Sequence, residues 1–177
     1  MVLIINLVKK ATKGDEKAFL KLFQIYEQDI YRTAFIYLKN ESDALDVVQE
    51  TAYRSFKYIK NLKEPKYFKT WLLKIAINCA YDLLRKRKNA IKIKTEVVEF
   101  FSEAANEDVI LTLTVRDLIE QLNEEEKSVI ILRFYQDLTI KEISETLDIP
   151  LGTAKSVLYR ALNKLRKDMK GHDVYER

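Results

Sequence analysis

Residues 138–170, LTIKEISETLDIPLGTAKSVLYRALNKLRKDMK, decide the fold of the C-terminal part of this chain. Thr139 and Glu142 stand at the spacing of a capping box, which opens a helix whose apolar residues fall on one face. Pro150 ends that helix, because the residue before a proline is displaced from helical backbone angles. A second helix follows from about Gly152, with apolar residues on one face and basic residues on the other. The pattern predicts a helix-turn-helix.

The second helix of this pair has the chemistry of a DNA-reading helix. A helix fits the major groove, so polar residues near its N-terminus reach base edges and later basic residues meet phosphates. Amphipathic helices with solvated lysines also occur in purely structural roles, but here cap, short helix, three-residue turn and basic helix stand together. The predicted DNA-binding residues are Thr153, Lys155, Ser156, Tyr159, Arg160, Lys164 and Lys167.

Composition predicts an all-α fold for the whole chain. It has 177 residues, of which 47% are hydrophobic and only three are glycine and two proline. No long run alternates with the period of two that a half-buried strand requires. The single cysteine, Cys79, allows no internal disulfide and fits a reducing cytoplasm. The apolar start, residues 2–8, is too short to insert into a membrane and predicts the beginning of a first helix.

Charge is distributed unevenly and divides the chain. Residues 51–94 hold thirteen Lys or Arg against two acidic residues, whereas residues 95–110 hold five acidic residues and no basic one. The basic block favours a phosphate-binding surface, and the acidic stretch has no steady hydrophobic period. We therefore predict two small helical domains, 1–90 and 111–177, joined by a flexible acidic linker at 91–110. Another cap, Asn123 with Glu126, opens a helix of the second domain.

The N-terminal domain contains a second informative stretch, residues 43–88. Its first helix is predicted to bury Leu45, Val48, Ala52, Phe56 and Ile59. Helical spacing then leaves an exposed charged patch that is suited to binding a partner. The patch consists of Asp46, Gln49, Glu50 and Arg54.

Aromatic residues alternate with lysines in the following loop, residues 61–69. Tyr67 and Phe68 stand among Lys63, Lys66 and Lys69. Single-stranded nucleic acid binds to this combination, because bases stack on rings while cations hold the backbone. Core packing is the alternative for one of the two aromatic residues, since rings bury large areas. The next helix ends in a basic run at residues 85–88, where cations also favour the helix C-terminus.

Taken together, these motifs resemble those of the extracytoplasmic-function sigma factors, and the resemblance covers nearly the whole chain. Residues 43–50, DALDVVQE, resemble the helix that docks on the β′ clamp of RNA polymerase. Residues 70–88 resemble the segment that opens and reads the minus-10 element, and residues 142–156 the helix-turn-helix that reads minus-35. Two departures are Val157, where an arginine often follows the serine, and Asp148, where the turn commonly has glycine.

The resemblance implies a sigma2-like N-terminal bundle and a sigma4-like C-terminal bundle that together direct polymerase to promoters and help melt them. The linker would enter the RNA channel of the polymerase. Implied partners are core RNA polymerase, through its β′ clamp and β subunit, promoter DNA, and a membrane-linked anti-sigma factor. The residues implied for polymerase binding are Asp43, Asp46, Gln49, Glu50 and Arg54. Those implied for minus-10 binding are Lys66, Tyr67, Phe68, Asn78, Arg85, Lys86, Arg87 and Lys88.

Two other functional classes remain to be compared with a sigma factor. A stand-alone helix-turn-helix regulator, with an N-terminal half that binds a ligand or protein, would not need core polymerase to recognise a promoter. An enzyme is disfavoured, because the single histidine, His172, lies in the polar tail and no metal-ligand or nucleophile spacing is present. The sequence predicts no metal and no cofactor.

Overall fold

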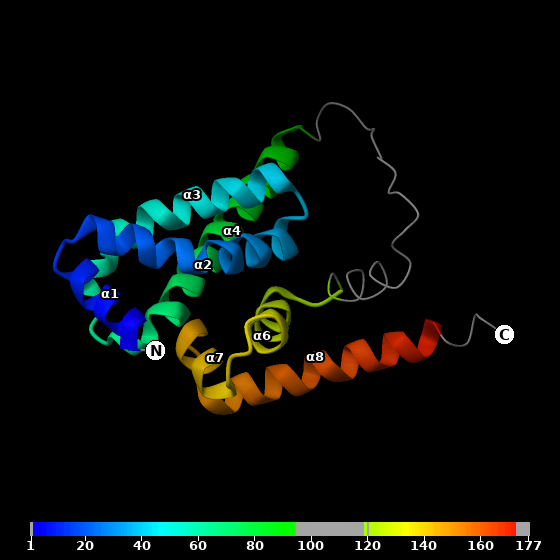
Figure 1. Cartoon of the computed structure of the whole chain (residues 1–177). Coiled ribbons are helices and arrows are strands. Elements are labelled where there is room, and N and C mark those ends of the chain that lie inside the picture. The colour runs from blue at the N-terminus through cyan, green and yellow to red at the C-terminus, as the bar shows by residue number, and fades with distance from the viewer. Residues whose placement is uncertain (1, 95–118, 120, 173–177) are drawn as a thin grey trace. The chain divides into compact units, whose positions relative to one another are not determined.

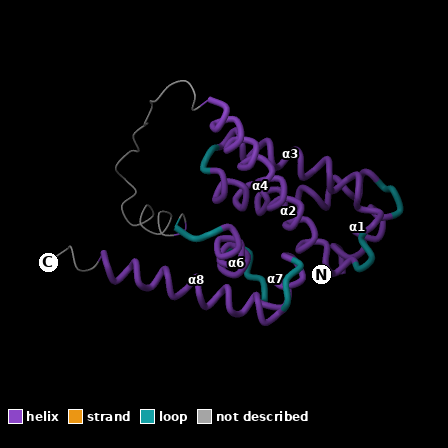
Figure 2. Tube along the Cα trace, turned by 180° about the vertical axis from the view of Figure 1, so that it is seen from behind, coloured by secondary structure: helices purple, strands orange, loops and turns teal. Residues whose placement is uncertain are grey.

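The chain forms two compact units, Met1–Val97 and Val98–Arg177. A computed structural model describes residues 2–94, 119 and 121–172, and every regular element in those ranges is helical (Figure 1; Figure 2). The all-α prediction is confirmed. The predicted linker begins within a helix that continues to Lys94, and its remaining residues, 95–110, lie outside the described part of the chain.

The first unit is a bundle of four helices: α1 (Val2–Thr12), α2 (Glu16–Leu38), α3 (Glu41–Tyr58) and α4 (Phe68–Lys94). Two short 3-10 helices, Ile59–Asn61 and Pro65–Tyr67, connect α3 to α4. Side-chain caps open two of the long helices: Asp15 accepts from the Ala18 amide at 2.9 Å, and Asn40 from the Asp43 amide at 3.0 Å. Each cap satisfies an amide that the helix itself leaves without a partner.

Helix α2 lies at the centre of this bundle and packs against α1, α3 and α4 (Figure 1). The core contains Val8 of α1, Leu22 and Ile30 of α2, and Phe68 and Leu72 of α4, none more than 1% exposed. A buried side chain of this size contributes about 1.5–3 kcal/mol relative to its exposed state. The bundle is therefore held together mainly by apolar burial.

The predicted inward face of α3 was wrong in part. Val48 and Ile59 are buried, but Leu45 and Phe56 are 52% and 45% exposed. The buried stripe instead contains small and polar residues: Asp43, Ala44, Val47, Val48, Thr51 and Ser55. Small side chains on that stripe allow α3 to lie close to its neighbours, so the larger apolar residues are turned partly outward.

The second unit contains α6 (Glu124–Phe134), α7 (Ile140–Leu147) and α8 (Leu151–His172). Helices α6 and α7 both pack on α8. Buried residues from all three, including Ile131, Ile143, Ala154 and Val157, make the core. The apolar face predicted for the second helix of the pair is confirmed, because Ala154, Val157, Leu158 and Ala161 are all buried. None of the described helices combines the length and apolar character needed to cross a bilayer.

Candidate functional site

The helix-turn-helix is built from local hydrogen bonds that the sequence encodes. The Thr139 amide donates to Glu142 Oε2 at 2.8 Å, and the Glu142 amide donates back to Thr139 Oγ1 at 3.3 Å. The predicted capping box is confirmed. Asp148 then takes a left-handed backbone with φ of 53°, in the position where glycine is common. Ser144 Oγ donates to the Ile149 carbonyl at 2.7 Å and closes the turn that directs the chain into α8.

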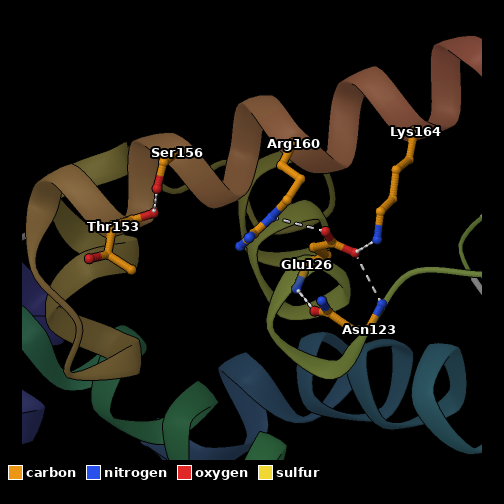
Figure 3. A network of polar contacts seen from close by, with 6 residues as sticks. All are labelled: Asn123, Glu126, Thr153, Ser156, Arg160 and Lys164. Atoms are coloured by element: carbon orange, nitrogen blue, oxygen red, sulfur yellow. Dashed lines mark hydrogen bonds and ion pairs between the residues drawn. The ribbon is translucent and has the colours of Figure 1, made fainter.

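The first nine residues of α8 leave four polar side chains exposed: Thr153, Lys155, Ser156 and Tyr159. Tyr159 is 66% exposed. Ser156 Oγ donates to the Thr153 carbonyl at 2.9 Å (Figure 3), so its hydroxyl proton is already used and its oxygen keeps the capacity to accept a hydrogen bond. Val157 is only 1% exposed, and position 157 in this chain therefore belongs to the core rather than to a DNA contact.

Two residues expected on the DNA surface are engaged with a buried carboxylate. The side chains of Arg160 and Lys164 extend from α8 toward Glu126 of α6 (Figure 3). Arg160 Nε lies 3.2 Å from Glu126 Oε1, and Lys164 Nζ donates to Glu126 Oε2 at 2.7 Å. A fully buried carboxylate requires cationic partners, and these two side chains supply them. Both stay partly exposed, and their assignment to minus-35 DNA stays a prediction.

Glu126 also belongs to a capping box, as the sequence predicts. The Asn123 amide donates to Glu126 Oε2 at 3.2 Å, and the Glu126 amide donates to Asn123 Oδ1 at 2.9 Å. Burial by itself would raise the pKa of Glu126, but hydrogen bonds from Lys164 and Asn123 and the charges of Lys164 and Arg160 outweigh it and lower the pKa. Glu126 is thus an ionised group that joins the start of α6 to the middle of α8.

The exposed face of α8 includes two polar residues that the sequence interpretation omitted. Asn163 and Arg166 are exposed and follow Lys155 and Tyr159 at helical spacing. The helical period alone could have identified them, because residues 155, 159, 163 and 166 lie on one face. Lys167, which was predicted, is exposed beside them.

On α3, the predicted polymerase-binding residues are partly paired with one another. Asp46 and Gln49 are exposed. Arg54 Nε bonds Glu50 Oε1 at 2.6 Å, and Arg54 Nη1 bonds Asp82 Oδ2 on α4 at 3.0 Å. The hydrogen bonds that Arg54 donates to Glu50, and then to Asp82, raise the pKa of Arg54 and keep it charged. Asp46, Glu50, Arg54 and Asp82 line one open cleft between α3 and α4.

Asp43 and Arg87 were assigned to different surfaces, yet the structure brings them together. Their side chains form an ion pair between the start of α3 and the C-terminal part of α4. The Asp43 side chain is only 13% exposed. The ion pair links the two surfaces, and the assignments of Asp43 to polymerase and of Arg87 to DNA stay predictions.

The loop before α4 resolves the alternative for its two aromatic residues. Phe68 is 1% exposed and its ring lies against Tyr26 and Trp71, with centroids 5.7 and 5.8 Å away. Core packing, the alternative that the sequence left open for one of the two rings, therefore describes Phe68. Tyr67 is half-buried, and Lys66 Nζ lies 4.8 Å from the centre of its ring.

The remaining residues predicted for minus-10 DNA lie along α4. Asn78, Arg85 and Lys86 are exposed, and Lys66 is exposed in the loop. The side chain of Lys88 lies outside the described residues. Lys66, Tyr67, Asn78, Arg85 and Lys86 thus stay available to a ligand of this unit.

Comparison with known proteins gives matches to both units. Residues 22–90 match the family model for Sigma-70 region 2, and residues 118–167 match that for Sigma-70, region 4. The chain is 36% identical over 149 residues to RNA polymerase sigma factor SigV of Bacillus subtilis, covering 84% of this chain and 89% of that protein. It is 32% identical over 177 residues to ECF RNA polymerase sigma factor SigW of the same organism, and the match covers 92% of this chain and 95% of that protein.

Two solved structures have a similar fold. CnrH in complex with the cytosolic domain of CnrY gives a TM-score of 0.74 at 21% identity, covering 96% of this chain and 98% of that one. The sigma factor RpoE in complex with the anti-sigma factor NepR, from Bartonella quintana, gives a TM-score of 0.71 at 20% identity. The match covers 87% of this chain and 98% of that one.

Proposed function

Because this chain belongs to the extracytoplasmic-function sigma factors and contains Sigma-70 regions 2 and 4, we propose how its two units divide promoter recognition. A member of this family is a non-enzymatic subunit that directs RNA polymerase to promoters. This membership decides against a stand-alone regulator and against an enzyme. We assign minus-35 reading to α8, and minus-10 capture and polymerase docking to the first unit. Run-off transcription with purified core polymerase tests the whole assignment and identifies a promoter for the measurements below.

The exposed N-terminal face of α8 is the observation that carries the proposal. This face exposes Lys155, Ser156 and Tyr159 just after the hydrogen-bonded turn, while the opposite face of α8 is buried in the core. Lys155 donates hydrogen bonds and suits guanine, whereas Ser156, whose proton is used by the Thr153 carbonyl, accepts from the amino group of adenine or cytosine. Arg166 and Lys167 hold phosphates farther along the helix.

Substitutions on α8 should separate base reading from phosphate binding. Lys155→Ala or Ser156→Ala should cost about 1–3 kcal/mol and relax preference at particular minus-35 positions. Arg166→Gln should weaken binding equally across sequences and reduce the salt slope by about one. Holoenzyme binding to a set of single-base promoter variants, measured at several salt concentrations, distinguishes these effects. Unchanged base preference in both Lys155→Ala and Ser156→Ala would refute base reading by this face.

The surface of the first unit supports capture of unpaired minus-10 bases. Tyr67 offers a ring beside the Lys66 ammonium, and Asn78 offers an amide that can pair with a base edge once the base leaves the stack. Arg85 and Lys86 add positive charge along α4 for the strand backbone. Stacking and amide pairing are both available only to melted DNA, so their binding energy favours promoter opening.

Tyr67→Ala should lower the preference of the holoenzyme for single-stranded over duplex minus-10 DNA, because each stacked base contributes about 1–3 kcal/mol. Asn78→Ala should reduce it further by removing a base-edge hydrogen bond. Fluorescence of 2-aminopurine in the minus-10 element follows opening directly. Tyr67→Phe keeps the ring and serves as the matched control. If Tyr67→Ala and Asn78→Ala both open the promoter as the parent does, base capture by these residues is disproved.

We further propose that α3 docks on the polymerase clamp. Asp46 and Gln49 are exposed one helical turn apart, with Glu50 beside them. Exposed charges of this kind contribute little to folding and are therefore available for a partner. They form an acidic surface that suits a cationic partner surface.

Asp46→Ala combined with Glu50→Ala should weaken binding to core polymerase about tenfold, equivalent to about 1.4 kcal/mol. The helical content and thermal midpoint should stay close to those of the parent. Binding can be followed by fluorescence anisotropy of a labelled chain. Glu16→Ala combined with Glu125→Ala removes the same charge from two other exposed helix starts and should bind normally. Equal affinity in the Asp46/Glu50 variant and this control would exclude the docking assignment.

We also propose that an anti-sigma factor binds this chain. The support is the family and the fold shared with RpoE, which was solved with the anti-sigma factor NepR. A membrane-linked anti-sigma factor and a cytoplasmic location both stay predictions from the family resemblance. Binding of such a factor should compete with core polymerase for the chain, and purified components would test this by displacement.

A further inference from the structure

Asp82 lies on α4, the helix assigned to promoter DNA, but its contact is with the docking helix. Its Oδ2 accepts from Arg54 Nη1 at 3.0 Å, and the two residues are 28 positions apart in the chain. The same guanidinium uses Nε to bond Glu50 at 2.6 Å. A planar guanidinium can bind two carboxylates at fixed angles, whereas an ammonium cannot impose that geometry.

The charges around this contact show how Asp82 affects the net charge of the surface formed by α3. The cleft between the helices is lined by three carboxylates, Asp46, Glu50 and Asp82, and by two cations, Arg54 and Lys86. Three negative and two positive charges leave a balance of −1. Without the charge of Asp82 the balance would be zero, and Arg54 would be free to neutralise Glu50 alone.

The exposure of these side chains indicates that the contact of Arg54 with Asp82 orients Arg54 and contributes little to folding. The side chains of Glu50, Arg54 and Asp82 are 46%, 35% and 44% exposed. Ion pairs with this much solvent access contribute little to stability. The second pair between these helices, Asp43 with Arg87, holds the start of α3 to α4 independently. Loss of Asp82 should therefore leave the bundle folded.

We infer that Asp82 is a positioning residue for polymerase docking: it shares the Arg54 guanidinium with Glu50, so that Arg54 does not neutralise Glu50 alone and the α3 surface stays acidic for a cationic partner. This inference rests on the proposed docking role of α3. It assigns Asp82 to polymerase binding although the residue lies within the promoter-binding helix. Electrostatic complementarity of this kind acts on association and is sensitive to salt.

The test uses the full-length chain and purified core polymerase. Asp82→Asn keeps the shape and a hydrogen-bond acceptor but removes the charge, and should weaken core binding about threefold to tenfold at low salt. The deficit should shrink at high salt, and the thermal midpoint should match the parent. Asp82→Glu should restore binding at least in part. Asp82→Asn combined with Glu50→Gln should bind no more weakly than Glu50→Gln alone, because Asp82 acts through Glu50.

The outcomes separate this inference from the docking proposal. If Asp46→Ala with Glu50→Ala weakens core binding but Asp82→Asn does not, docking stands and the role of Asp82 is disproved. If neither variant weakens core binding, the docking proposal and the role of Asp82 are both disproved. Additive losses in the Asp82/Glu50 double variant, or a loss that salt does not reduce, would also overturn the inference, since Asp82 would then act by another route.

Discussion

Replacing Arg160 and Lys164 together by methionine should destabilise the second unit by about 3–5 kcal/mol, because it leaves a buried carboxylate without cations. The Glu126 side chain has no exposed area and takes its two ion pairs from these residues. Methionine retains most of the apolar stem of each side chain, so the change is mainly electrostatic. Adding Glu126→Gln to the double variant should recover most of the loss, since the buried charge is gone.

The pH dependence should change direction between the parent and this double variant. In the parent the pKa of Glu126 is lowered, so its stabilisation is complete above the unfolded pKa and is lost as pH falls through the folded pKa. In the double variant burial acts without cations and raises the pKa, so protonation at lower pH should stabilise the fold. Circular dichroism melts from pH 7 to pH 2 measure both the loss of stability in the parent and the gain in the double variant. A double variant as stable as the parent would show that the Glu126 network is dispensable.

Phe68→Ala should unfold much of the first unit instead of affecting DNA selectively, with a loss of about 3–5 kcal/mol. The ring is 1% exposed and contacts Tyr26 and Trp71, so truncation leaves a cavity at the junction of α2 and α4. Trp71 is the single tryptophan of the chain, and its fluorescence during urea unfolding reports this unit. The loss should appear as a lower urea midpoint.

Two controls define this result. Phe68→Leu conserves most of the volume and should cost less than about 1.5 kcal/mol. Tyr67→Ala should leave the urea midpoint nearly unchanged while it lowers promoter opening. A Phe68→Ala protein with the parental urea midpoint and impaired capture of single-stranded minus-10 DNA would show that Phe68 contacts DNA, and would contradict its core role.

The local features of the second unit could be predicted because their causes lie within a few residues. Both capping boxes, Asn123 with Glu126 and Thr139 with Glu142, join residues three positions apart, so the sequence predicts them directly. The buried face of α8 follows from a helical period of apolar residues. The extended site on α8 could also have been completed by periodicity, which places Arg166 beside the predicted residues.

Two features could not be fixed because the sequence allowed more than one answer. On α3, Leu45 and Phe56 share a face that could have been buried, but packing buried the smaller residues beside them. In the loop before α4, Tyr67 and Phe68 are neighbours of similar size, and only their contacts show which ring enters the core. Sequence reasoning left that choice open because adjacent aromatic residues carry equal apolar area.

The sequence by itself determined two helical units, the helix-turn-helix and the polar residues at the start of α8, since these depend on periodicity and on contacts within one helical turn. Only the tertiary structure decided which charged side chains pair with a carboxylate on another helix. Lys164 meets Glu126 across 38 residues, and Arg54 meets Asp82 across 28. Long side chains at the edge of a buried face can bind solvent, a partner or another helix. The buried carboxylate of Glu126 settles the choice for Lys164, because leaving that charge unpaired costs more than exposing the cation to water. The exposed pair of Arg54 with Asp82 depends instead on which side chains the packing of α3 against α4 brings within reach.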